Sequence, residues 1–263
     1  MLRFGFQRRI TPPPHFVERL ITMSSSASIQ PRNFPAWLTP TLFILGLLAA
    51  LVAEPVVSAN RERFFTATGL PPFPPALMWK VFWDNVYNHA ICYGFLGIVT
   101  CGLVGLAAGA TIRPMRAILG AVVGSVVGLF AGVTLGVSGW YLSERVLESS
   151  YMDSIYKAIL IFVPFWFGLT LAACFVALLV TNKLNHFAST VFPSLAFVIA
   201  AVVVYIGVVT ALFPSDWPGR IIPEFGRVRL VLEITGCLGL AGAVLAVMRA
   251  SSRVEKKIES ATI

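Results

Sequence analysis

The chain has 263 residues, of which 57% are hydrophobic, and its mean hydropathy is +0.82. Only 12% of the residues are Asp, Glu, Lys or Arg, about half of the roughly 25% that a soluble domain carries. A soluble fold of this length cannot bury so much apolar surface, so these values exclude a soluble enzyme and a disordered chain. The class that remains is a polytopic membrane protein.

Six apolar segments are long enough to cross a bilayer, whose hydrocarbon core of about 30 Å takes about 20 helical residues. They are residues 37–57, 88–110, 117–142, 158–181, 190–213 and 228–248. Apolar runs without alternation, such as residues 196–209, favour helices over a membrane β-barrel. We therefore expect an all-α integral membrane protein, a bundle of six transmembrane helices with a glycine zipper in the third.

The first predicted span has two interpretations. Val57 and Ala59 follow a short apolar core and resemble a signal-peptidase site, and cleavage there would leave five helices. The long segment before that core favours an uncleaved helix, which Pro55 would end at the membrane surface. We expect little order in residues 1–35, and Met23 is an alternative start of the protein.

Basic residues predict the orientation of the bundle. Of the 20 Lys and Arg residues, 12 fall in the two tails and in the two short loops on the same side. Because cytoplasmic loops are rich in Lys and Arg, we place both termini in the cytoplasm and the chain in a cytoplasmic-type (inner or plasma) membrane. The six-helix domain then covers residues 36–249, between cytoplasmic tails at 1–35 and 250–263, with an outer loop at 58–87.

Glycine recurs at every fourth position of the third span, and small residues recur at the same interval in the second. The glycines that we expect to pack helices are Gly105, Gly109, Gly120, Gly124, Gly128, Gly132 and Gly136. Glycine lets helix backbones approach closely within a membrane. Four residues advance a helix by 400°, so the stripe drifts around the third helix and one straight neighbour cannot cover it. We therefore expect the third helix to be central and to pack on more than one side. A glycine-lined pore and a seam between copies are the alternatives.

One charged residue, Glu233, lies clearly inside a predicted span, about 7 Å below the outer end of the sixth helix. Charged residues at such positions are functional candidates, and this carboxylate is a candidate ion or proton site in a transport path. Arg229 lies one helical turn earlier, so the alternative is an ion pair between these two residues. Glu54 and His89 fall near the same surface, where all four residues would form a polar cluster if they converge.

Aromatic residues mark the predicted outer surface. Trp79, Phe82, Trp83 and Tyr87 follow one another at helical spacing before the second span, and Trp140 lies near the outer end of the third. Such residues are typical of an interfacial helix at headgroup depth. The alternative is a face that binds a partner.

The sequence contains no phosphate-binding loop, dinucleotide fingerprint or paired acidic metal motif. The three histidines fall on both sides of the membrane, and the four cysteines form no Cys-x-x-Cys pair. We therefore expect no metal, no cofactor and no enzymatic activity. We also expect no nucleic-acid partner, because topology and anionic lipid explain the net charge of +8.

Two functions remain for such a chain. The first is a non-catalytic structural or accessory protein that contacts the lipid bilayer, another copy or the subunits of a membrane complex. The second is a small secondary transporter or channel that uses Glu233.

Overall fold

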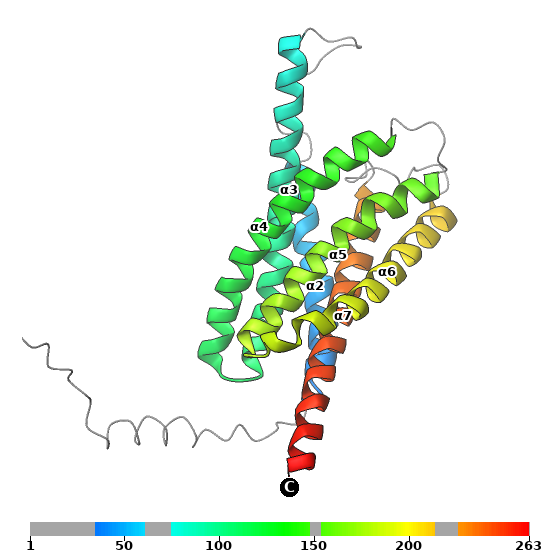
Figure 1. Ribbon diagram of the computed structural model, residues 1–263. Helices are drawn as coiled ribbons and strands as arrows, with labels where there is room; N and C mark the ends of the chain where they lie inside the picture. Colours follow the sequence, from blue (N-terminus) through cyan, green and yellow to red (C-terminus); the bar gives the residue numbers. More distant parts are fainter. Residues whose placement is uncertain (1–34, 61–74, 148–153, 214–225, 263) are drawn as a thin grey trace, which may run out of the picture. The chain divides into compact units, whose positions relative to one another are not determined.

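The computed structural model describes residues 35–60, 75–147, 154–213 and 226–262. Every secondary-structure element within these ranges is a helix, and six of the helices are long and apolar enough to cross a membrane (Figure 1). They are α2 (Leu38–Asn60), α3 (Pro75–Ala110), α4 (Pro114–Leu147), α5 (Ser154–Val180), α6 (Val191–Leu212) and α7 (Gly226–Thr262). A short 3-10 helix, η1 (Leu184–Thr190), precedes α6. The prediction of an all-α membrane protein with six spanning helices is confirmed.

Several helix ends differ from the predicted ones. Pro55 lies inside α2, which continues to Asn60 instead of ending at the proline, because membrane helices tolerate the loss of one backbone hydrogen bond when neighbouring helices pack around it. The last of the six helices runs to Thr262, so residues 250–262, predicted as a tail, extend α7. The prediction of little order in residues 1–35 falls almost entirely on residues 1–34, which lie outside the described residues.

The predicted interfacial helix and the second predicted span form one continuous helix. α3 begins at Pro75, a position where the missing N–H of proline costs little, and runs without a break to Ala110. Its 36 residues measure about 54 Å at 1.5 Å per residue, well beyond the roughly 30 Å of a hydrocarbon core. The first turns of α3 project past the ends of the neighbouring helices (Figure 1). Of the outer loop predicted at 58–87, residues 58–60 end α2, residues 75–87 begin α3, and residues 61–74 lie outside the described residues.

The turn after α5 shows how a short connection reverses the chain. Asn182 has a φ of 58°, in the left-handed region that asparagine tolerates better than most residues. The N–H of Asn182 donates to the carbonyl of Leu179 at 3.1 Å, and the N–H of Lys183 donates to that of Leu178 at 2.7 Å. These two bonds close the helix end and direct the chain into η1 and α6.

The six helices form two groups. α3, α5 and α7 each contact the other two, and they form the centre of the bundle. Each remaining helix packs on two of these three: α2 on α3 and α7, α4 on α3 and α5, and α6 on α5 and α7. The most apolar stretch is 61% buried in α3 and in α7 and 50% in α5, compared with 33%, 22% and 28% in α2, α4 and α6. Along the chain, peripheral and central helices therefore alternate.

The expectation that the third helix is central is wrong. α4 is the least buried of the six spans, although it packs on two helices, α3 and α5, as expected. One neighbour, α3, covers the whole glycine stripe of α4, because small residues recur at the same interval in α3 and the two stripes drift around their helices together. The large side chains of the core lie instead around α5, where Trp166, Tyr205 and Phe162 are fully buried.

Candidate functional site

A salt bridge between Arg229 and Glu54 joins α7 to α2. The guanidinium of Arg229 donates to both carboxylate oxygens of Glu54, from Nε at 2.8 Å and from Nη2 at 2.7 Å. The two side chains are 5% and 19% exposed, so the pair is largely removed from water. Such a fork-like pair fixes geometry as well as charge. The ion pair expected within α7 is thus formed between helices whose partners are 175 residues apart.

The first turn of α7 lies beside this ion pair. A side chain at Gly226, the first residue of α7, would come within 3.5 Å of Arg229 Nη2 and 3.6 Å of Glu54 Oε1. The N-terminal end of a helix carries a partial positive charge, which stabilises a nearby carboxylate. The start of α7 therefore lies close to the Glu54 carboxylate.

Glu233 lies one turn after Arg229 on α7 and has a different environment. The residue is only 4% exposed, and its Oε2 has no hydrogen-bond partner among the described residues. The charges of Glu54 and Arg229 act on it. The Cys92 thiol and the Tyr93 phenol of α3 also interact electrostatically with Glu233 and Arg229. Glu233 is thus a buried carboxyl close to an ion pair that is already complete.

His89 belongs to another part of the molecule. It is 8% exposed, and its Nδ1–H donates to the backbone carbonyl of Asn85 at 2.8 Å. Its ring lies 5.9 Å from that of Trp140 on α4, and its backbone oxygen faces Gly136 of the same helix. Of the four residues proposed as a polar cluster, the structure brings Glu54, Arg229 and Glu233 together and places His89 toward α4.

Two further buried polar groups belong to α5 and were not among the proposed site residues. Trp166 and Thr170 lie one turn apart, and the Trp166 Nε1–H and the Thr170 hydroxyl have no hydrogen-bond partner among the described residues. The Trp166 ring lies directly on α7, since a Cβ at Gly236 would come within 2.2 Å of ring atoms. Gly236 follows Glu233 by three residues, so these groups border the same region of α7. A Trp and a Thr one turn apart within an apolar span are the signal that points to them.

The glycines proposed as packing residues all lie where α3 and α4 meet. A Cβ at Gly105 would come within 2.0 Å of the Gly120 carbonyl oxygen, and one at Gly128 within 1.9 Å of that of Gly97. Gly97, which was not among the proposed residues, therefore belongs to the same contact. At the remaining proposed glycines, a Cβ would come within 2.0 to 2.7 Å of backbone or Cβ atoms of the opposite helix. These glycines are Gly109, Gly124, Gly132 and Gly136.

The aromatic residues at the start of α3 form a chain of ring contacts. Trp79 stacks on Phe82 at 5.6 Å, and Trp83 lies 6.0 Å from Tyr87. Three of these rings are exposed on α3: Trp79 by 65%, Tyr87 by 51% and Trp83 by 40%. Trp140, expected among the interfacial aromatics, is instead 7% exposed and packs on Phe82 at 5.3 Å.

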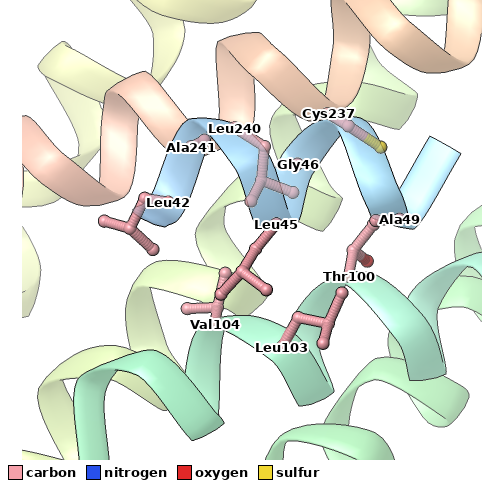
Figure 2. Close-up of a pocket in the computed structure, with 10 residues that line it drawn as sticks. All are labelled: Leu42, Leu45, Gly46, Ala49, Thr100, Leu103, Val104, Cys237, Leu240 and Ala241. Carbon is pink, nitrogen blue, oxygen red and sulfur yellow. The ribbon is translucent and has the colours of Figure 1, made fainter. Parts of the chain in front are cut away.

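A small cavity lies between α2, α3 and α7. Figure 2 shows apolar side chains such as Leu45, Leu103 and Val104 projecting into the space between α2 and α3. The cavity volume of about 10 Å³ is close to the minimum that one water molecule needs. Its lining is apolar except for Thr100, whose hydroxyl donates to the Leu96 carbonyl within its own helix. This cavity is therefore not a binding site for an organic substrate.

In the part of the chain that the structure describes, no group of three or more His, Cys, Asp or Glu side chains is arranged to hold a metal ion. Among the described residues, the buried groups that could carry chemistry at the start of α7 are the Arg229–Glu54 ion pair and the Glu233 carboxyl. Comparison with known proteins found no matching family, no matching curated protein and no matching solved structure.

Proposed function

We propose that the chain is a non-catalytic accessory or structural membrane protein that binds another membrane protein through the start of α3. The observation that carries this proposal is the exposed aromatic stripe of Trp79, Trp83 and Tyr87, which recurs every fourth residue on the projecting end of the helix. Aromatic side chains are enriched where proteins associate, and exposed apolar patches outside the bilayer core mark interaction sites.

The length of α3 supports a protein partner. Because the helix is about 24 Å longer than a hydrocarbon core, its first turns extend beyond the acyl chains that cover the rest of the bundle. The ring contacts from Trp79 to Tyr87 hold the stripe in a fixed arrangement before any partner binds. A preordered aromatic surface loses little conformational entropy on association.

The test is extraction of the tagged chain in a native lipid environment, followed by native mass spectrometry. We expect a stoichiometric partner with the unmodified chain and its loss from the triple variant Trp79→Ala, Trp83→Ala, Tyr87→Ala. A matched control exists on α4, where Val122, Val126 and Phe130 are exposed at the same four-residue spacing. Their replacement by alanine should leave the complex intact. A chain that is alone before any substitution contradicts the proposal.

A second candidate function is a small transporter or channel that uses Glu233. The specific observation in its favour is a carboxyl that is 4% exposed and has an unpartnered oxygen beside the central helices, since charged residues inside a membrane protein usually mark ion or proton pathways. In reconstituted vesicles, Glu233→Gln should abolish coupled flux in a transporter. In an accessory protein the same change should leave the vesicles equally tight and alter only stability.

A further inference from the structure

The charges buried near the start of α7 do not balance within the described residues. Arg229 gives two hydrogen bonds to Glu54, so these two residues form a neutral pair. Glu233 lies one turn further along α7 with no hydrogen bond to its Oε2. If Glu233 were ionised, the three residues would carry a net charge of −1 in a region shielded from water.

Among the residues that the structure describes, the groups that interact with Glu233 offer no positive charge besides Arg229. They come from α2, α3 and α7, and one further phenol on α6 interacts with Tyr93. The groups that interact with Glu233 are Glu54, Cys92, Tyr93, Arg229 and Cys237, and the phenol that interacts with Tyr93 is that of Tyr205. From α5, the indole of Trp166 lies against Gly236, one turn after Glu233, and is a donor without charge. An ionised Glu233 would therefore be a buried, unpaired charge, which proteins avoid.

A proton removes this charge with the smallest rearrangement. When Oε2 takes up a proton from the aqueous medium, the carboxylate becomes a neutral carboxylic acid with one O–H donor, and no other bond breaks. A metal cation would need several oxygen ligands around it. The neighbours of Glu233 are thiols, aromatic groups and a guanidinium, and both carboxylate oxygens of Glu54 are already bound to Arg229.

We propose that Glu233 is a proton-binding site, where a bound proton neutralises the carboxylate. The Arg229–Glu54 pair lies between this site and the start of α7. The site lies seven residues after Gly226, about 10 Å along the helix, beside the buried indole of Trp166. This inference goes beyond the proposed accessory function, which does not require a proton site.

The first test is labelling with dicyclohexylcarbodiimide of the full chain in lipid nanodiscs, followed by peptide mass mapping. A protonated carboxyl in an apolar region adds its O–H across a C=N bond of this reagent, and the adduct rearranges to a stable acylurea. We expect labelling of Glu233 and not of Glu54. We expect it to fall by about tenfold or more as the pH is raised, because the protonated fraction declines.

The sharpest variant keeps Glu233 and changes its neighbour. Glu54→Gln removes the negative partner of Arg229, so the guanidinium one turn away becomes available to Glu233. The Glu233 carboxylate is then stabilised in its ionised form, and its labelling should fall at least tenfold at constant pH. Labelling equal to that of the unmodified chain would overturn the proposal, because it would mean that the ion pair does not control the site.

A second measurement does not depend on access of the reagent. The infrared spectrum of the unmodified chain should contain the C=O stretch of a protonated carboxyl at neutral pH, and Glu233→Gln should remove it. Glutamine has nearly the same shape as glutamic acid, and an unchanged thermal midpoint would show that the variant is folded. Absence of the band overturns the proposal. Protection from labelling by sodium chloride, compared with choline chloride at the same pH, would also overturn it and identify a metal-cation site.

Discussion

The contact between α3 and α4 differs from the contact between α2 and α7 in what holds it together. Along α3 and α4, each step of four residues in one helix is matched by a step of four in the other, and backbone meets backbone at glycine after glycine. Along α2 and α7 the approach is looser: at Gly46 a Cβ would lie 3.0 Å from the Cys237 carbonyl oxygen. That contact also carries the buried Arg229–Glu54 pair.

The two contacts therefore fail in opposite ways. The α3–α4 contact has no room for an added atom, because the two backbones are closely spaced. Dispersion between these backbones is what stabilises the contact. The α2–α7 contact has room near its ion pair but cannot lose a charge, because the remaining partner would be left buried alone. Substitutions that add volume test the first, and substitutions that remove charge test the second.

The largest effect is expected for Gly128→Leu in α4. The Cβ alone would come within 1.9 Å of the Gly97 carbonyl oxygen, so α3 and α4 must separate and lose their close contacts over several turns. We expect loss of nearly all monodisperse protein in size-exclusion chromatography after mild detergent extraction.

Gly207→Leu in α6 is the matched control. A side chain at Gly207 meets nothing within 4 Å, and this glycine is exposed on the bundle surface. Its variant should elute as the unmodified chain does. Equal yields of the Gly128 and Gly207 variants would show that the glycine stripe is not a tight contact and would remove the distinction between the two helix pairs.

A smaller but still large effect is expected for Arg229→Met. The change leaves Glu54 largely buried without its partner, which costs about 3–5 kcal/mol in buried pairs of this kind, and the thermal midpoint should fall accordingly. Arg227→Met, at an exposed position two residues earlier, is the control and should change the midpoint far less.

The double variant Glu54→Met, Arg229→Met sharpens this prediction. Apolar residues of similar size often replace a buried ion pair without loss of stability, so most of the midpoint lost in the single variant should return. If the double variant is as unstable as Arg229→Met, the pair does not act as a unit, and the α2–α7 contact depends on packing in the way that α3–α4 does.

The glycine stripe shows how far spacing alone can lead. Five glycines at intervals of four in one span predict a close helix contact, and the structure places all of them against α3. The same spacing led to the wrong position for that helix. The glycine positions turn around the axis of α4, but the pattern of one helix does not show whether a neighbouring helix has a matching pattern. Only the matching small residues of α3 allow one helix to cover the stripe, and α4 lies at the edge as a result.

The ion pair shows the opposite limit. The distance of one turn between Arg229 and Glu233 favoured a pair within the helix, yet Arg229 binds Glu54, which is 175 residues away. Local spacing defines which side chains can meet within a helix. It cannot reveal which side chains a second helix brings to the same place, and that contact is what leaves Glu233 with an unpartnered oxygen.

By itself, the sequence determined the class of the protein and the number of its helices, because apolar length and low charge are properties of each segment alone. It also identified Glu233 and the glycines as unusual residues for their positions. Only the tertiary structure decided that α3, α5 and α7 form the centre, that Arg229 is neutralised by Glu54, and that His89 lies toward α4. Those outcomes depend on which helices become neighbours, and in a uniformly apolar chain this is set by shape complementarity between helices rather than by hydropathy.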